Sequence, residues 1–276
     1  RMVLLGGGPI GCELAQSFAR LGSEVIQVER NERVMMREDP EVSELAASAL
    51  RKSGVRLMTG YEAVRCELLD DDVDSEKRLI VKNSEGVEEV IEFDRLICAV
   101  GRTARLTGYG LEDLGIQTDR TVVTNEYLET LYPNIYAAGD VAGPFQFTHT
   151  AAHQAWYAAV NALFGEWKAF KADYSVIPWT TFIDPEVARV GLSETEARER
   201  GITFEVTRYG IDDLDRVYTR DDMVTADVIF AATGVTDGSI LAGIKREVGF
   251  LTAETLLMRS RTGSVRRMLY RAPVRP

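Results

Sequence analysis

Three glycines near the start of the chain have the spacing of a phosphate-binding turn. Gly6, Gly8 and Gly11 follow the apolar run 2–5 and open a segment, 9–21, in which apolar residues recur with a helical period. In such a turn the first glycine permits the bend, the second lets the backbone approach a pyrophosphate, and the third lets the helix pack on the strand. The N–H groups at the helix start favour phosphate charge. The spacing predicts a dinucleotide site completed by Pro9 and Ile10.

Glu29 closes the next predicted strand, 25–29, and lies 18 residues after Gly11. A carboxylate there can accept hydrogen bonds from the adenine ribose hydroxyls and repels the 2′-phosphate of NADP. NAD is therefore the expected cofactor. NADP remains the alternative, because Arg30 and Arg33 lie close to Glu29 in the sequence and could offset its repulsion of the 2′-phosphate. A glycine-rich turn without a ligand is the alternative, and it leaves Glu29 unexplained.

The elements around this motif predict an α/β fold. A helix over 39–52, capped by Asp39 with Pro40 at its first position, and a strand over 55–58 complete a Rossmann-like, doubly wound parallel sheet. Short strands over 64–68, 78–82 and 88–93 predict an antiparallel meander. The remaining expected elements are strands over 95–100, 134–138, 187–190, 204–209, 227–232, 255–258 and 265–270, a helix over 149–164, and a helix over 193–200 with a Ser193–Glu196 capping box.

Composition narrows the class of protein. The 43 acidic and 32 basic residues give a net charge of -11, which argues against general nucleic-acid binding. Cys12, Cys66 and Cys98 are an odd number without metal-ligand spacing, and each is expected to be a small buried hydrophobe. With neither a membrane-length apolar run nor a signal peptide, the expectation is a soluble, cytoplasmic protein without a metal site.

Ordered motifs resemble those of the FAD-dependent pyridine nucleotide-disulfide oxidoreductases, such as mercuric reductase and dihydrolipoamide dehydrogenase. The motifs are GGGPIGCELA at 6–15, AVGR at 99–102 and AGDV at 138–141. The run IPWTTFIDPE at 177–186 resembles the opening of that family's dimerisation domain. The resemblance covers about residues 1–215.

On the NAD side, the resemblance implies roles for three residues. Glu13, placed on the first turn of the glycine-loop helix, resembles the glutamate beside the nicotinamide, although a carboxylate favoured by the helix dipole is an adequate alternative. Val64 and Gly101 resemble positions that line the NAD cleft and could equally be ordinary core and turn residues.

On the flavin side, Asp140, preceded by Gly139, resembles the aspartate that binds the ribitol chain of FAD, with a turn-capping role as the alternative. Thr148 opens a helix whose N-terminus the family aims at the flavin. His149 and His153, the two histidines, are expected to pack rather than catalyse.

The resemblance implies an incomplete enzyme. It divides the chain into an NAD(P)-binding domain at 1–100, the C-terminal half of an FAD-binding domain at 101–172, and the beginning of a dimerisation domain at 173–215. The family's first FAD turn, redox cysteine pair and catalytic histidine–glutamate pair find no counterparts. We therefore expect dinucleotide binding with FAD held weakly or not at all, and no catalytic residue is assigned. Intact relatives are homodimers.

The last segment, 216–276, resembles the C-terminal part of class II fructose-1,6-bisphosphatase through DVIFAATGVTDG at 227–238. Two further hypotheses follow: a metal-dependent sugar phosphatase, or a non-catalytic fusion of two fragments joined near 215–222. Asp237 could suggest a metal ligand, but one aspartate in a turn is more often structural. The loop 233–238 could also hold a phosphate with its amides.

Overall fold

The computed structural model describes residues 1–68, 77–209, 228–232 and 268–273, in two compact units. The first unit comprises Arg1–Gly101 and the described residues from Pro178 onward, and the second comprises Arg102–Ile177. Asp237, the loop 233–238, the proposed junction at 215–222 and the expected strand 255–258 lie outside the described residues.

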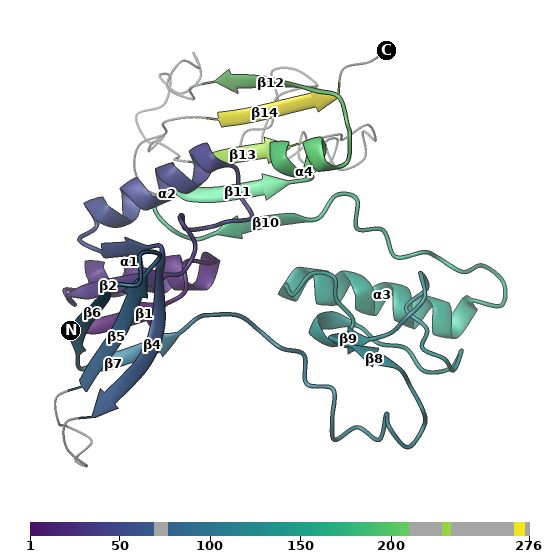
Figure 1. Cartoon of the computed structure of the whole chain (residues 1–276). Helices are drawn as coiled ribbons and strands as arrows, with labels where there is room; N and C mark the ends of the chain where they lie inside the picture. The colour runs from purple at the N-terminus through teal and green to yellow at the C-terminus, as the bar shows by residue number, and fades with distance from the viewer. Residues whose placement is uncertain (69–76, 210–227, 233–267, 274–276) are drawn as a thin grey trace. The chain divides into compact units, whose positions relative to one another are not determined.

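A four-stranded parallel sheet is the centre of the first unit, with the strand order β3-β2-β1-β7 (Figure 1). The apolar runs that predicted it form the strands, and the segments with helical period form the two helices between them. The bounds are β1 Met2–Leu5, α1 Pro9–Arg20, β2 Val25–Glu29, α2 Pro40–Lys52, β3 Arg56–Thr59 and β7 Arg95–Cys98. Asp39 is the N-cap of α2 and Pro40 its first residue, so the predicted start of this helix is confirmed.

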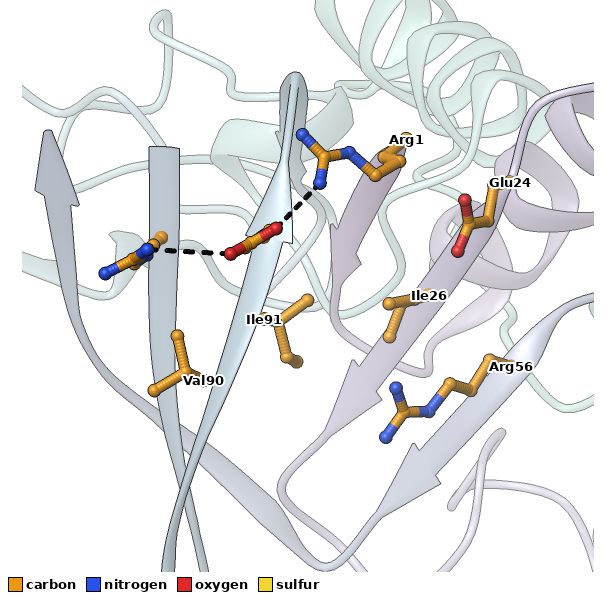
Figure 2. Close-up of a pocket in the computed structure, with 8 residues that line it drawn as sticks. Arg1, Glu24, Ile26, Arg56, Val90 and Ile91 are labelled. Atoms are coloured by element: carbon orange, nitrogen blue, oxygen red, sulfur yellow. Dashed lines mark hydrogen bonds and ion pairs between the residues drawn. The ribbon is translucent and has the colours of Figure 1, made fainter. Parts of the chain in front are cut away.

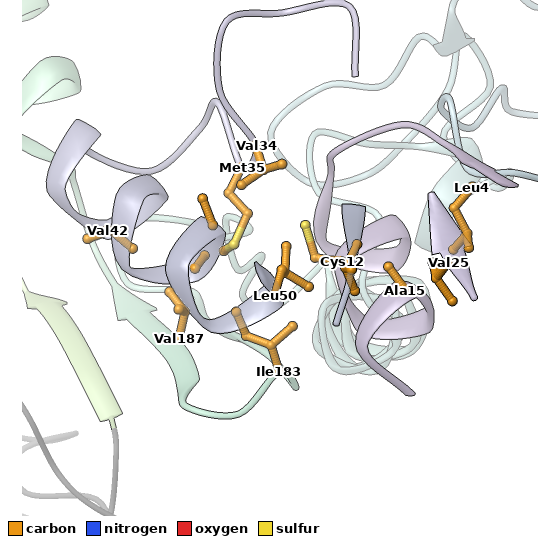
Figure 3. Packing of buried hydrophobic residues seen from close by; sticks show 13 residues of the cluster. Leu4, Cys12, Ala15, Val25, Val34, Met35, Val42, Leu50, Ile183 and Val187 are labelled. Carbon is orange, nitrogen blue, oxygen red and sulfur yellow. The ribbon is translucent and has the colours of Figure 1, made fainter. Parts of the chain in front are cut away.

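One face of the sheet is covered by the two helices. Leu4 and Val25 on the strands pack with Cys12 of α1 and Leu50 of α2, and Ile183 from the later segment joins the same cluster (Figure 3). Cys12 is fully buried, as expected, whereas Cys66 and Cys98 are exposed, so the expectation that all three cysteines are buried is wrong for those two.

The other face is covered by the antiparallel meander rather than by a second helix layer. Its strands are β4 Tyr61–Leu68, β5 Lys77–Asn83 and β6 Glu88–Phe93, in the order β4-β5-β6. Leu79 and Ile91 of the meander pack against Val3 and Ile26 of the parallel sheet. An antiparallel sheet can pack one face on a core and expose the other, which is how the meander covers the parallel sheet here.

The second unit contains little regular structure besides one long helix. Its elements are β8 Thr118–Asp119, β9 Thr121–Val122, the 3-10 helix η1 Gly139–Val141 and α3 Thr148–Phe164. The strand predicted over 134–138 is wrong, because this stretch contributes only an isolated bridge between Tyr136 and Glu129. Its apolar residues are buried instead by packing with Ile116 and Val122.

Strands from both sides of the proposed junction share sheets in the first unit. β11 Glu186–Val190 lies between β10 Pro178–Thr181 and β13 Val228–Ala232, and β12 Phe204–Tyr209 pairs with β14 Met268–Pro273. Ser193 and Glu196 form the predicted capping box at the start of α4, Glu194–Glu199. Among the described helices, none is long and apolar enough to cross a membrane.

Candidate dinucleotide site

The glycine turn is shaped by two glycines that the protein's own packing requires. Gly6 has a φ of +107°, and a Cβ there would lie 2.4 Å from the carbonyl oxygen of Ala99. A Cβ on Gly11 would lie 2.1 Å from the carbonyl oxygen of Gly6, within the turn itself. The first turn of α1 is therefore held close to the end of β1, as the spacing of the motif predicted.

Gly8 differs from these glycines because no atom of the part of the chain that the structure describes lies in the space beside it. It is the N-cap of α1, with φ -75° and ψ 177°, and a Cβ there would meet nothing within 4 Å. No side chain caps this helix, and its first turn contains no acidic residue. The positive end of the α1 dipole thus faces open space at the N–H groups that follow Gly8. This arrangement suits an anion.

Glu29 is buried beside the turn and holds it in place. Its Oε2 accepts a hydrogen bond from the Gly7 N–H at 2.5 Å, and its Oε1 accepts one from the Asn31 N–H at 2.7 Å and another from the Asn31 amide. A Cβ on Gly7 would lie 2.8 Å from the Glu29 Cγ, so the middle glycine makes room for this carboxylate. Gly7, the middle glycine of the run 6–8, was the sequence signal for this contact, which the spacing of Gly6, Gly8 and Gly11 alone did not predict.

The loop after Glu29 folds back onto the glycine turn. The Met35 N–H donates to the Gly7 carbonyl at 2.7 Å. Arg33 is held inside the loop, because its Nη1 donates to the Glu38 carbonyl at 2.7 Å and to the Ser43 hydroxyl at 2.5 Å. The Arg33 guanidinium is therefore engaged by the protein, whereas Arg30 is exposed.

A buried ion pair anchors the same loop to the strands that follow the second unit. Arg189 of β11 is 1% exposed, and its Nη1 lies 3.6 Å from Oε2 of Glu38, which is 6% exposed. The guanidinium also lies over the Trp179 ring, 4.6 Å from its centroid, and the Trp179 Nε1 donates to the Glu38 Oε1 at 3.1 Å. Burial raises the pKa of Glu38, and the charge of Arg189 opposes that rise. Nothing in the local sequence indicated this pair, since its members are far apart in the chain.

Three residues expected near the NAD cleft have clear structural positions. Glu13 is the fifth residue of α1, so its predicted place on the first turn is wrong, and its Oε1 accepts the Phe182 N–H at 2.8 Å. Val64 is exposed at a register shift in β4, where an extra residue redirects the strand. Gly101 has a φ of +146°, a conformation that glycine adopts readily.

The residues expected to contact flavin gather at the start of α3 in the second unit. Gly139 has a φ of +82°, and its N–H donates to the Gln154 Oε1 at 2.6 Å. The Asp140 carboxylate is half-exposed in η1, 3.9 Å from the Arg102 Nη1. Thr148 is the first residue of α3 and is exposed. Arg102, the last residue of the motif 99–102, thus lies near Asp140 within the second unit.

The two histidines of α3 make packing contacts. The His149 ring stacks on Phe147 with 5.3 Å between centroids. The His153 Nε2 lies 2.9 Å from the Asp173 carbonyl, and its ring meets Tyr157 edge-on at 4.8 Å. In residues 1–68, 77–209, 228–232 and 268–273, no group of three or more His, Cys, Asp and Glu side chains is arranged to hold a metal ion.

An open pocket of about 520 Å³ lies at the amino ends of the parallel strands, the edge opposite to the glycine turn (Figure 2). Its arginines face glutamates: Arg1 and Arg78 both pair with Glu92, at 3.0 and 3.6 Å, and Arg56 pairs with Glu89 at 3.4 Å. Glu24 also lines the pocket, so the three arginines are matched by three glutamates and the pocket has no excess of positive charge. The carboxyl edge, with its uncapped helix and Glu29, remains the candidate site.

Comparison with known proteins gives two family matches. Residues 1–155, more than half of the chain, match the model of the pyridine nucleotide-disulphide oxidoreductases. Residues 189–271 match that of the bacterial fructose-1,6-bisphosphatase, glpX-encoded.

Individual relatives point to the first of these families. The chain is 36% identical to mercuric reductase of Bacillus cereus over 218 residues, which cover 78% of this chain and 33% of the relative. It is 34% identical to dihydrolipoyl dehydrogenase of Thermus scotoductus over 262 residues, 93% of this chain and 55% of the relative. The HOCl-induced flavoprotein disulfide reductase RclA from Escherichia coli has a similar structure, with a TM-score of 0.66 and 28% identity over 78% of this chain and 48% of that one. The chain thus spans between a third and just over half of these proteins.

Proposed function

The chain belongs to the pyridine nucleotide-disulphide oxidoreductases, and from this membership we propose that its first unit binds NAD(H) at the carboxyl edge of the parallel sheet. The pyrophosphate would lie against the backbone at Gly8, Pro9 and Ile10, at the start of α1. The adenine ribose would lie against Glu29. Val64 and Gly101 are the further residues that we propose along the dinucleotide.

The observation that carries this proposal is the open, uncapped start of α1 beside a buried carboxylate. Gly8 leaves room for a ligand, while Gly6 and Gly11 are accounted for by internal packing. A helix N-terminus supplies both N–H donors and a favourable dipole for a pyrophosphate. Glu29 at the end of β2 supplies acceptors for ribose hydroxyls.

We propose NAD rather than NADP as the cofactor. Glu29 would repel a 2′-phosphate, and its carboxylate is fixed by Gly7 and Asn31 so that it cannot easily move away. Arg33, the nearby cation that could have offset this repulsion, donates to Glu38 and Ser43 within its own loop. Arg30, the residue that follows Glu29, is exposed and is the neighbouring cation that could contact a 2′-phosphate.

Hydride transfer to flavin is the reaction that we propose for the complete site. A bound nicotinamide supplies the hydride and a bound flavin accepts it. In this chain Glu13 would lie beside the nicotinamide, while Gly139, Asp140 and Thr148 would hold one side of the FAD. Since these residues form only part of a flavin site, we expect FAD to be held weakly or not at all.

The test is a titration of the purified chain with NADH, together with its visible absorption spectrum. Saturable NADH binding with little absorbance near 450 nm would support the proposal. Full flavin absorbance with NADH-dependent reduction of a dye would refute the expected weakness of FAD binding and establish a working oxidoreductase.

A second candidate function is suggested by the match of residues 189–271 to bacterial fructose-1,6-bisphosphatase. Phosphatases of that kind require metal ligands, and the described residues contain no such group. Release of phosphate from fructose-1,6-bisphosphate in the presence of Mg²⁺ or Mn²⁺ would support this function, and its absence under both metals would exclude it.

A further inference from the structure

Two exposed cysteines lie on different strands of the first unit. Cys66 is on β4 of the meander, and Cys98 is the last residue of β7 in the parallel sheet. They are 32 positions apart in the chain, so their sequence spacing gave no sign of a pair. The strand registers show how they are placed.

Cys98 faces the meander. Along β7, Leu96 packs into the cluster between the two sheets, while Ile97 packs into the cluster under the helices. Successive side chains on a strand point to opposite faces, so Cys98 lies on the same face as Leu96. Its neighbour across the ladder, Leu5, packs against the same inter-sheet cluster.

Cys66 faces the parallel sheet. It lies opposite Leu79 in the β4–β5 ladder, and Leu79 is buried in the inter-sheet cluster. Residues directly opposite each other in an antiparallel pair have side chains on the same face. The two thiols therefore point into the same space from opposite sheets.

The direction of the meander brings the thiols to the same end of that space. β6 follows the amino edge of the parallel sheet, because Glu89 pairs with Arg56 on β3 and Glu92 pairs with Arg1 beside β1. β4 runs in the same direction as β6, and β5 lies between them. With β6 along the amino edge of the parallel sheet, β4 is the meander strand nearer the carboxyl edge. β4 starts just after β3, and the registers place Cys66 opposite Leu79 and Ile91, one residue from the position of Glu92, which pairs with Arg1 beside β1. Since β7 is the neighbour of β1, we infer that Cys66 comes over the carboxyl end of β7. Burial, and then the charge of Cys98, raise the pKa of Cys66, which agrees with this proximity.

We propose that Cys66 and Cys98 form a redox-sensitive dithiol that closes to an intramolecular disulfide when the protein meets a peroxide. One thiol loses its proton, and the thiolate attacks a peroxide oxygen of hydrogen peroxide, giving a sulfenic acid and hydroxide, which takes up that proton to give one water. The second thiolate attacks that sulfur and displaces hydroxide, which takes up a proton to give a second water. Two thiols are oxidised, and one hydrogen peroxide is reduced to two waters.

The disulfide would also lower the affinity of the dinucleotide site for NADH. This second part of the inference rests on the proposed function. Ala99 follows Cys98, and its carbonyl packs against Gly6 at the base of the glycine turn. Val64 lies two residues before Cys66 on β4. A covalent link between β4 and β7 would therefore restrict both sides of the proposed NAD cleft, and we expect NADH to bind at least about fivefold more weakly to the oxidised protein.

The experiment uses the whole chain, reduced and then treated with hydrogen peroxide at low protein concentration. Before oxidation, Ellman's reagent should detect two thiols in the native protein and three in denaturant, because Cys12 is buried. After oxidation, one thiol should remain in denaturant. The intact mass should fall by two hydrogen atoms, and a tryptic digest should contain a cross-link between the peptides of Cys66 and Cys98. Cys66→Ser and Cys98→Ser should each abolish the cross-link, whereas Cys12→Ala should retain it.

Three results would overturn the proposed dithiol: three thiols after peroxide treatment, separate sulfinic or sulfonic acids on the two cysteines, or disulfides only between molecules. NADH titration of both forms tests the effect on the site separately. Equal affinity of the reduced and oxidised proteins would refute the effect but not the disulfide. Failure of the reduced protein to bind NADH would refute the proposed function and leave the mass measurement valid.

Discussion

Gly8→Ala and Gly11→Ala place the same methyl group three residues apart and should have different effects. At Gly11 the new Cβ would lie 2.1 Å from the Gly6 carbonyl oxygen, whereas ordinary contact begins near 3.4 Å. The turn and the helix must therefore separate by about 1.3 Å, the difference between those two distances. Overpacking of this kind costs roughly 3 kcal/mol, and the better helix propensity of alanine returns about 1 kcal/mol. We expect Gly11→Ala to lose about 2 kcal/mol of unfolding free energy.

At Gly8 the methyl group meets nothing within 4 Å, and the backbone angles are accessible to alanine. Alanine is a poorer N-cap than glycine by about 0.5–1 kcal/mol, and the reduced entropy of the unfolded chain offsets most of this. Stability should therefore change by less than about 0.5 kcal/mol. The methyl group would nevertheless occupy the space that we assign to the pyrophosphate. Loss of one charge-assisted contact, about 1.5–3 kcal/mol, corresponds to roughly 10- to 100-fold weaker NADH binding.

Urea unfolding followed by circular dichroism measures the first effect, and fluorescence titration with NADH at fixed ionic strength measures the second. The unfolding curve of Gly8→Ala shows that any loss of NADH binding by this variant is not due to a loss of stability. Gly11→Ala is the matched variant, because it places a methyl group in the same motif. If Gly8→Ala binds NADH as tightly as the unsubstituted protein, no ligand approaches Gly8 and the reasoning is refuted. A Gly11→Ala variant of undiminished stability would contradict the packing argument.

Three further predictions concern charged residues. Glu29→Gln should weaken NADH binding, and it should lower the ratio of the NADPH dissociation constant to the NADH dissociation constant about tenfold, because the repulsion of the 2′-phosphate is removed. An unchanged ratio would contradict this. Arg189→Met should cost about 3–5 kcal/mol in urea unfolding, because the buried Glu38 would lose its ion-pair partner, as would Glu196; a loss below about 1 kcal/mol would show that these pairs are dispensable. Burial raises the pKa of Glu38 from 4.5 in the folded protein. The protonated carboxyl therefore contributes to the unfolding free energy below about pH 4.5, and this contribution is lost as the pH rises through the folded-state pKa. Glu38→Gln should therefore show a smaller decline in unfolding free energy above pH 4.5 than the unsubstituted protein, and parallel curves would argue against this assignment.

The features that the sequence predicted correctly are those set by neighbouring residues. The bend at Gly6, the start of α2 at Pro40 and the Ser193–Glu196 capping box each depend on a few consecutive positions. The meander was likewise predicted from short strands close together in the sequence, and the structure confirms their antiparallel order.

Features that depend on distant parts of the chain were missed or wrong. The run 134–138 looks like a buried strand, yet a strand needs a neighbour to pair with, and Tyr136 has only a single bridge. The pairing of Glu38 with Arg189 joins segments that only the fold brings together. The same is true of Cys66 and Cys98, whose common location follows from the crossing of two sheets rather than from spacing.

The central claim is that the edge of the sheet bearing Gly8 and Glu29 is an NAD site, and calorimetric titration of the whole chain with NADH and NADPH tests it most directly. We predict saturable binding of one NADH per chain, with NADPH at least about tenfold weaker because of the repulsion by Glu29. No detectable NADH binding at millimolar concentration, or equal affinity for the two nucleotides, would contradict it.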